Sequence, residues 1–402
     1  MAHFIDVMAL HKSTLRAMLI NTTSRLWRFY NMDDYAKRYC LMCPGPVNVS
    51  PRVLDAMIGS EIGHREIEFS ALLKNIRTNC INLMKLSPEE YSMVVITGSG
   101  SAANEAVLCS AIRPEDNVLS LVTGEFGRRL GEISSIYNPK TQTHVQDWGT
   151  QLDLQAVETR LKTQSFDWVT MVHHETSTGE LQPVKEIGEL CKKYGAKLFV
   201  DAVSSFMADK LDLKEANITF MSTSSGKALG MGPGLSLVVG KIDEFQRLAT
   251  YPVRNYYLSL ARHYDFFNNK LQTPNTPGIA LFIALNEALK IIAEEGVDNR
   301  FNRQAEKAQL FRQGLQRLGL NLLHPDHVLS NAVSSICLPK GMNFAELREA
   351  LRAKGFIVYG GKGPLTDQIF QVSTMGYIQN NDIENLLNAL QESMTQCLHS
   401  VA

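Results

Sequence analysis

The sequence lacks a charge imbalance, a long apolar run and any low-complexity tract. Its 402 residues carry 40 Lys+Arg and 41 Asp+Glu, a formal net charge of −1, so it has no basic excess with which to neutralise nucleic-acid phosphates. No apolar run approaches the roughly 18 residues that span a bilayer. Hydrophobic residues make up an ordinary 45% of the chain. We therefore expect neither a nucleic-acid partner nor a membrane, but a folded cytoplasmic enzyme that acts on small molecules.

The cysteines do not form a disulfide framework, because the seven of them are scattered and odd in number. One C-x-x-C pair, Cys40 and Cys43, has no second Cys or His pair nearby to complete a metal site. His173 and His174 are adjacent, so on a strand their side chains would point to opposite sides. We expect no metal site.

The chain divides into an extension and two predicted domains. Residues 1–40 precede the regular pattern, 41–318 are predicted to form a large α/β domain, and 319–402 a small α+β domain. The segment near 41–62 is predicted to pack toward the small domain. Residues 11–28 contain four basic residues and no acid, so organelle targeting stays open beside a helical extension that packs on the protein.

Short apolar segments joined by helical patterns predict a largely parallel sheet with helices on both faces. A long helical pattern runs from about 279 to 318, and its end is the predicted domain boundary. The predicted strands of the large domain are 93–97, 118–122, 168–172, 197–200, 218–221 and 235–239.

Chemically useful residues follow several of these strands, at the edge where open parallel sheets bind ligands. The run Gly98–Ala103 opens a helix and suits a phosphate, although it also fits the dinucleotide pattern G-x-G-x-x-A. Asp201 ends one strand, and Lys227 lies among small residues after the next. Such a lysine suits Schiff-base formation.

Three runs resemble the class V aminotransferases that use pyridoxal phosphate: 173–183 (HHETSTGELQP), 199–205 (FVDAVSS) and 224–229 (SSGKAL). Within that family the chain is most similar to 2-aminoethylphosphonate–pyruvate aminotransferases, and slightly less similar to alanine–glyoxylate aminotransferases. The resemblance spans roughly residues 40–395. It implies fold type I, with a mostly parallel seven-stranded sheet in the large domain and a small α+β C-terminal domain.

The resemblance also implies residue roles. Lys227 would hold pyridoxal 5′-phosphate and move the reacting proton, and Asp201 would pair with the pyridine nitrogen. Phe126 would stack on the ring and Thr176 would bond its phenolic oxygen. The remaining implied contacts are to the phosphate: Ser99, Gly100, Ser101, Ser225, Gln272 and Thr273. Because the Gln272–Thr273 loop of such enzymes reaches the neighbouring subunit's phosphate, the resemblance implies a homodimer with shared active sites.

One position departs from the family pattern. Many members have a carboxylate-binding arginine where this chain has Gln371, and a neutral amide cannot replace a bidentate guanidinium. Arg65 and Lys362 are the other candidates for contacting the substrate anion.

The leading hypothesis is amino transfer from 2-aminoethylphosphonate, which has no α-carboxylate, to pyruvate, giving phosphonoacetaldehyde and alanine. An alanine– or serine–glyoxylate aminotransferase, or a related pyridoxal-phosphate lyase, is the alternative. A nucleotide-binding dehydrogenase is a more distant alternative.

Overall fold

The computed structural model describes residues 39–58 and 61–399, and those from 41 onward belong to one compact unit. All but the last two residues of the predicted extension 1–40 lie outside the described residues. Within those described, seven strands form the main sheet, in the spatial order β2 (Tyr91–Thr97), β10 (Leu235–Lys241), β9 (Ile218–Ser224), β8 (Lys197–Asp201), β5 (Trp168–Val172), β3 (Val118–Val122) and β4 (Thr141–Val145).

The sheet is mostly parallel, as predicted. β4, β3, β5, β8 and β9 pair in parallel, whereas β10 is antiparallel to both β9 and β2. The sequence pattern gave no sign of β4, because Thr141–Val145 (TQTHV) is not an apolar run. That polarity fits an edge strand, since one long side of β4 has no partner strand in the described sheet.

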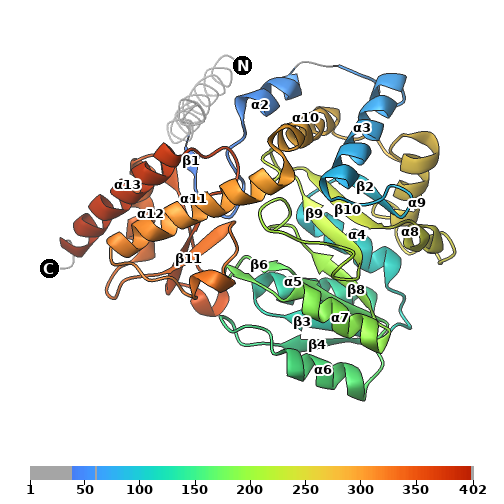
Figure 1. The fold of residues 1–402 in the computed structure, drawn as a ribbon, viewed down its shortest axis with the longest axis horizontal. Coiled ribbons are helices and arrows are strands. Elements are labelled where there is room, and N and C mark those ends of the chain that lie inside the picture. Colours follow the sequence, from blue (N-terminus) through green and yellow to red (C-terminus); the bar gives the residue numbers. More distant parts are fainter. Residues whose placement is uncertain (1–38, 59–60, 400–402) are drawn as a thin grey trace, which may run out of the picture. The chain divides into compact units, whose positions relative to one another are not determined.

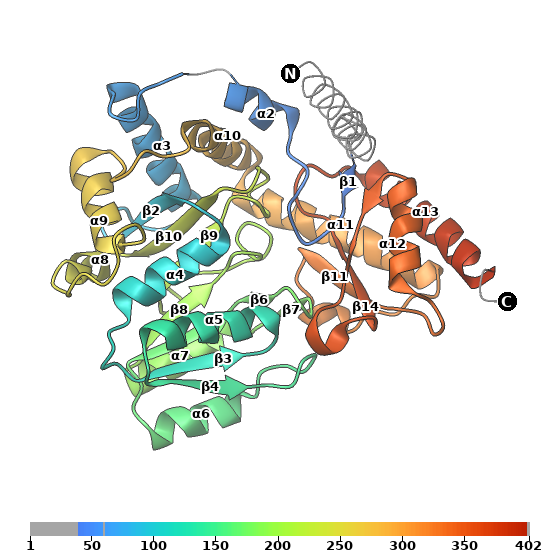
Figure 2. The ribbon, with the colours of Figure 1, turned by 180° about the vertical axis from the view of Figure 1, so that it is seen from behind.

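Successive strand residues pack into two different cores, one on each face of the sheet. Val169 and Met171 belong to one cluster of buried side chains, and Trp168 and Val172 belong to the other. Figures 1 and 2 show the two helix layers from opposite sides. The first core is covered by α3 (Ile67–Leu83), α6 (Leu154–Thr163), α7 (Val184–Tyr194) and α10 (Ile279–Glu295), and the second by α4 (Gly100–Ala111), α5 (Glu125–Tyr137), α8 (Ile242–Leu248) and α9 (Leu260–Asp265).

The predicted helical stretch 279–318 is two helices, because Gly296 adopts a φ of +84° between α10 and α11 (Val297–Arg317). α11 ends one residue before the predicted boundary, and the division into two domains stays a prediction. The C-terminal elements are β11 (Val333–Cys337), α12 (Phe344–Ala353), β12 (Phe356–Ile357), β13 (Tyr359–Gly360), β14 (Ile369–Ser373) and α13 (Asn380–His399), of which β11, β14 and β13 form an antiparallel sheet.

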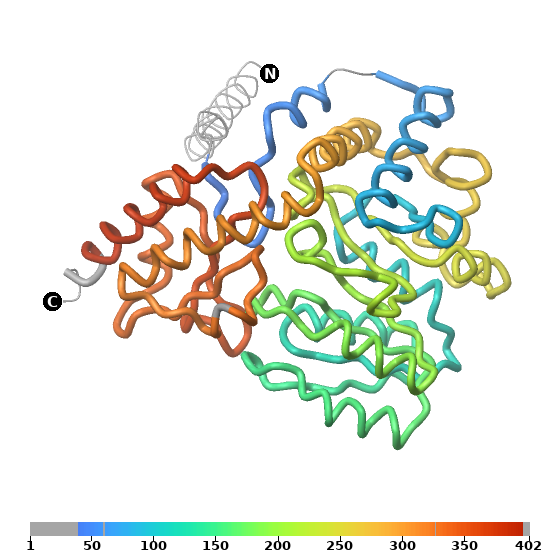
Figure 3. The backbone as a smooth tube through the Cα atoms, viewed as in Figure 1, coloured from blue at the N-terminus to red at the C-terminus, as the bar shows by residue number. Residues whose placement is uncertain are grey.

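The segment after residue 41 runs beside these C-terminal elements (Figure 3). The Met42 N–H donates to the Ile357 carbonyl at 2.9 Å, and the Met42 carbonyl accepts from the Ser373 N–H at 2.8 Å. These bonds hold the start of the segment against the C-terminal strands. The remaining short elements are β1 (Cys40–Leu41), α2 (Pro51–Ile58), β6 (His174–Glu175), β7 (Glu180–Leu181), a π-helix (Phe266–Lys270) and two 3₁₀ helices (Asp326–Val328 and Gly363–Leu365).

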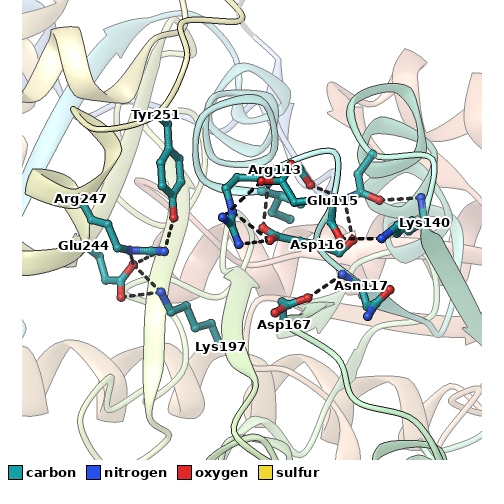
Figure 4. A network of polar contacts seen from close by, with 12 residues as sticks. Arg113, Glu115, Asp116, Asn117, Lys140, Asp167, Lys197, Glu244, Arg247 and Tyr251 are labelled. Atoms are coloured by element: carbon teal, nitrogen blue, oxygen red, sulfur yellow. Dashed lines mark hydrogen bonds and ion pairs between the residues drawn. The ribbon is translucent and has the colours of Figure 1, made fainter.

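The amino ends of β3, β5 and β8 are joined by ion pairs and hydrogen bonds (Figure 4). Arg113 pairs with Asp116 at 2.7 Å, and the Asn117 N–H donates to Asp167 at 2.7 Å. Lys197, the first residue of β8, pairs with Glu244 at 2.8 Å. These contacts pair charged groups at the amino ends of the strands, whereas ligands of open parallel sheets bind at the carboxyl ends.

Within the part of the chain that the structure describes, no helix is both long and apolar enough to cross a bilayer. No group of three His, Cys, Asp or Glu side chains in that part is arranged to hold a metal ion.

Candidate active site

A cavity of about 260 Å³ opens at the carboxyl ends of the central strands. Val172, Asp201 and Ser224, the last residues of β5, β8 and β9, all line it. The structure brings seven of the sequence-predicted residues to its wall: Ser99, Gly100, Ser101, Phe126, Thr176, Asp201 and Lys227. A larger groove of about 1250 Å³ near α2, α10 and α11 contains none of them.

Lys227 lies in the turn after β9, where its amine donates to the carbonyl of Pro44. Burial lowers the pKa of Lys227 to about 8; the Lys362 cation acts in the same direction, and Cys43 and Asp201 oppose it. Gly45 gives the lysine its space. A Cβ there would lie 2.9 Å from the Lys227 Cδ, and the Gly45 φ of +121° also disfavours any other residue.

Asp201 is a buried carboxylate held by two donors. The Asn104 side chain donates to its Oδ2 at 2.6 Å, and the Val203 N–H donates to its Oδ1 at 2.8 Å. Asn104 is itself fixed by Ser222, whose hydroxyl donates to the amide oxygen at 2.5 Å. Burial raises the pKa of Asp201, although both donors favour the charged form. The sequence did not single out Asn104, which reaches Asp201 from the second turn of α4.

The first turn of α4 lies at the cavity wall. Ser99 precedes the helix in an extended conformation, and the N–H groups of a first helical turn have no partner within the helix. Gly100 packs so closely on the Val203 side chain that an added Cβ would lie 2.9 Å from its methyl carbons. Glycine at 100 therefore lets the start of α4 pack directly against Val203, and both residues line the cavity.

Glu175 fixes the position of Phe126, and sequence reasoning missed it. It is fully buried, and its carboxylate accepts from the N–H groups of Phe126 at 3.2 Å and Gly127 at 2.9 Å, at the start of α5. It also accepts from the Ser177 N–H at 3.1 Å. A carboxylate is stabilised at a helix N-terminus. Here the carboxylate comes from Glu175 in β6, far from α5 in the sequence, so no capping pattern within the helix could have predicted it.

Gln371 does not face the cavity. It is buried in β14, and its amide nitrogen donates to the Thr176 carbonyl at 2.6 Å and to the Ser335 hydroxyl at 3.0 Å. The Thr176 hydroxyl in turn contacts the Ser204 hydroxyl at 2.5 Å. Gln371 thus supports the loop that carries Thr176.

Two cations gather around Phe126. The Lys362 ammonium and the Arg129 guanidinium carbon each lie 4.9 Å from the centre of its ring. Among the described residues no carboxylate lies within 4 Å of the Lys362 ammonium. Arg129 lines the cavity and was missed in the sequence, although it follows Phe126 by three residues, the spacing of neighbours on a helix face.

The other predicted residues lie outside the cavity. The Ser225 hydroxyl donates to the Gly232 carbonyl at 2.8 Å, and it is the preceding Ser224 that lines the wall. Arg65 donates to the Gln272 side chain at 2.9 Å and to the Thr273 carbonyl at 2.7 Å. These three form a cluster whose residues do not line the cavity.

The residues present fit pyridoxal phosphate. The cavity combines a buried amine, a buried carboxylate and the free N-terminus of α4, which match an aldehyde, a protonated ring nitrogen and a phosphate in chemistry. Phe126 and Val203 provide apolar walls for a ring.

Comparison with known proteins points to the same cofactor chemistry. The model of the family described as aminotransferase class-V matches residues 52–386. The chain is 35% identical over 351 residues to an uncharacterized aminotransferase of Methanocaldococcus jannaschii, covering 87% of this chain and 90% of the relative. It is 31% identical over 368 residues to a 2-aminoethylphosphonate–pyruvate transaminase of Salmonella schwarzengrund, covering 89% and 98%.

A solved structure of an alanine–glyoxylate aminotransferase from Nostoc sp. superposes with a TM-score of 0.85 at 30% identity, covering 89% of this chain and 95% of that one. These matches exclude the dehydrogenase alternative and confirm the family, the fold type and the cofactor that the motifs predicted. The chain belongs to the class V aminotransferases and is a transaminase that depends on pyridoxal phosphate.

Proposed function

We propose that this transaminase moves the amino group of 2-aminoethylphosphonate to pyruvate, forming phosphonoacetaldehyde and alanine. The observation that carries the proposal is the position of two cationic side chains, Lys362 and Arg129, beside Phe126. Gln371 provides no guanidinium and its amide is used internally, whereas Lys362 and Arg129 approach Phe126 at the cavity. A donor with a phosphonate and no α-carboxylate suits this arrangement.

The chain's own residues account for the chemistry. Pyridoxal phosphate supplies, when bound, an aldehyde carbon that takes the amino group and a ring that accepts electrons. Lys227 is the proposed nucleophile and proton carrier, because its lowered pKa leaves part of the amine neutral near neutral pH. Asp201, kept in place by Asn104 and Val203, is the proposed partner of a protonated ring nitrogen.

The other proposed cofactor contacts are made by residues that line the cavity. The first turn of α4, at Ser99–Ser101, holds the phosphate through backbone N–H groups. Phe126 and Val203 pack on the ring, and Thr176 faces its edge. Ser224 replaces Ser225 in this proposal, since its side chain lines the cavity.

The proposal includes a homodimer with shared sites. Gln272, Thr273 and Arg65 lie together outside their own cavity, which agrees with a loop serving a neighbouring subunit. Co-expression of a Lys227→Ala chain with a Gln272→Ala/Thr273→Ala chain tests this. Random pairing places one intact site in half of the dimers and restores about one quarter of wild-type activity; unshared sites would restore none beyond the sum of the two inactive variants.

The substrate test is a panel of amino donors with pyruvate and with glyoxylate, followed by ³¹P and ¹H NMR of the products. We expect 2-aminoethylphosphonate with pyruvate to give the highest kcat/KM. Lys362→Gln and Arg129→Gln should raise the KM for 2-aminoethylphosphonate, and Lys185→Gln, which changes a surface lysine paired with Glu215, serves as the charge-matched control. Absence of phosphonoacetaldehyde and alanine would overturn the substrate assignment.

Alanine– or serine–glyoxylate transfer is the second candidate, favoured by the similarity to the Nostoc structure. The same panel separates the two. A higher kcat/KM for alanine or serine with glyoxylate would require a carboxylate partner other than Gln371.

A further inference from the structure

Trp148 joins the turn after β4 to a loop of the C-terminal elements. Residues 147–150 form this turn, in which the Thr150 N–H donates to the Asp147 carbonyl at 3.1 Å. Figure 2 shows the chain leaving β4 toward the C-terminal elements. There the half-buried Trp148 ring packs on Gly363, and a Cβ added at 363 would lie 2.8 Å from the indole Cη2. The site roles proposed above give Trp148 no use.

The contact with Gly363 is made by the six-membered ring of the indole. The atoms nearest to a Cβ at 363 are Cη2, Cζ3 and Cζ2 of Trp148, at 2.8, 3.2 and 3.3 Å, so an added methyl group would displace either the indole or the loop. The neighbouring Gly149 packs on His324, since a Cβ at 149 would lie 3.3 Å from the His324 Cε1. The turn after β4 therefore contacts the C-terminal elements at two points.

Lys362 directly precedes Gly363 in the loop on which Trp148 packs. The Lys362 carbonyl accepts from the Leu365 N–H at 3.0 Å, and the side chain extends toward the cavity, where its ammonium lies 4.9 Å from the centre of the Phe126 ring. Within the described part of the chain no carboxylate lies within 4 Å of this ammonium. Its place therefore depends on the loop that carries it.

The Lys362 cation acts on Lys227. Burial is the principal cause of the lowered Lys227 pKa, and the Lys362 cation lowers it further. Such an interaction weakens with distance, and at an exposed site water and salt screen it. Displacement of the loop would therefore reduce the effect of Lys362 on Lys227.

We propose that Trp148 is a positioning residue, whose indole supports Gly363 and thereby holds the Lys362 ammonium over Phe126. The inference rests on the proposed function where it concerns the phosphonate, because Lys362 is a proposed partner of that group. The action of Lys362 on Lys227 does not depend on which amino donor is used.

The pH midpoint of Lys227 acylation by acetic anhydride tests this in the full-length apoprotein, without any donor. Lys362→Gln should move the midpoint upward, and Trp148→Ala should move it in the same direction by no more than that. In a Lys362→Gln protein Trp148→Ala should have no further effect, because the cation that it positions is gone. Val145→Ala is the control and should leave the midpoint unchanged, since this exposed side chain lines the same surface groove as Trp148.

A size exchange across the contact keeps the test independent of how any one variant folds. Gly363→Ala should push the loop off the indole and raise the midpoint. Trp148→Phe shortens the side chain at the point of contact, so Gly363→Ala/Trp148→Phe should bring the midpoint back toward wild type. A merely structural role for Trp148 gives a lower Tm and an unchanged midpoint in Trp148→Ala. That result, or additive shifts in the double variant, would overturn the proposal.

Steady-state kinetics separate this inference from the proposed function. Trp148→Ala should raise the KM for 2-aminoethylphosphonate by about two- to fivefold, the range for a screened ion pair, and leave kcat within about twofold. A raised Lys227 midpoint with an unchanged KM would support the positioning role and count against the phosphonate contact. An unchanged midpoint would overturn the positioning role whichever donor the product panel identifies.

Discussion

The lowered pKa of Lys227 can be measured without cofactor or substrate. Its pKa of about 8 compares with an ordinary value of 10.5, and the principal cause is burial of the amine beside Pro44. At pH 7 this leaves about one amine in eleven neutral, against about one in three thousand for an ordinary lysine. The Lys227 amine should therefore be about 300-fold more available as a nucleophile near neutral pH than its ordinary pKa allows.

Pulsed labelling of the apoprotein with acetic anhydride, read by mass spectrometry of the Lys227 peptide, gives the titration directly. The labelling rate should rise with pH and level off above about pH 9. Limited access through the cavity lowers the plateau and leaves the midpoint unchanged. The exposed Lys85 provides an internal reference for reagent concentration.

Lys362→Gln sharpens the test, because the Lys362 cation contributes to lowering this pKa. Its removal should move the Lys227 midpoint upward, and Lys185→Gln should leave it in place. A wild-type labelling rate that still rises steeply above pH 10 would refute the reasoning that burial disfavours the charged amine.

Three further substitutions follow from the same contacts. Gly45→Ala should destabilise the protein by about 1–3 kcal/mol in urea unfolding and abolish the Lys227 plateau, because it forces φ of +121° on alanine and crowds the lysine; unchanged stability would contradict this. Glu175→Gln should cost about 1–3 kcal/mol in the same assay, since an amide group cannot accept all the N–H donors at the start of α5. Asn104→Ala should weaken pyridoxamine phosphate about tenfold by equilibrium dialysis, because Asp201 loses a donor that favours its charged form; wild-type affinity would exclude that role.

The sheet and its ligand edge could be predicted because both leave local signals. Fully buried strands such as Trp168–Val172 are nearly continuous apolar runs, and Asp201 is the last residue of another strand, β8. β4 left no such signal because it is a polar edge strand, and the break at Gly296 was hidden because the apolar spacing continues through it.

The supporting contacts of the site could not be predicted, because they join residues far apart in the chain. Asn104 reaches Asp201 across 97 positions and Glu175 reaches Gly127 across 48. The sequence shows that Gln371 replaces the arginine of the family pattern. It does not show that the Gln371 amide bonds to the Thr176 carbonyl. Only the fold brings β14 beside the Thr176 loop, 195 positions away.

The position of the cations limits how the proposed phosphonate could be recognised. Arg129 is 41% exposed in its side chain, and Lys362 is exposed, so water and salt screen both charges. Exposed ion pairs contribute about 0–1 kcal/mol each, so two such cations distinguish a dianion from a monoanion only modestly at high ionic strength. The KM for 2-aminoethylphosphonate should therefore rise more steeply between 20 mM and 500 mM potassium chloride than the KM for pyruvate, and Lys362→Gln should flatten that rise. Equal salt dependence for both substrates would mean that these cations do not hold the phosphonate, and that its specificity comes from groups inside the cavity.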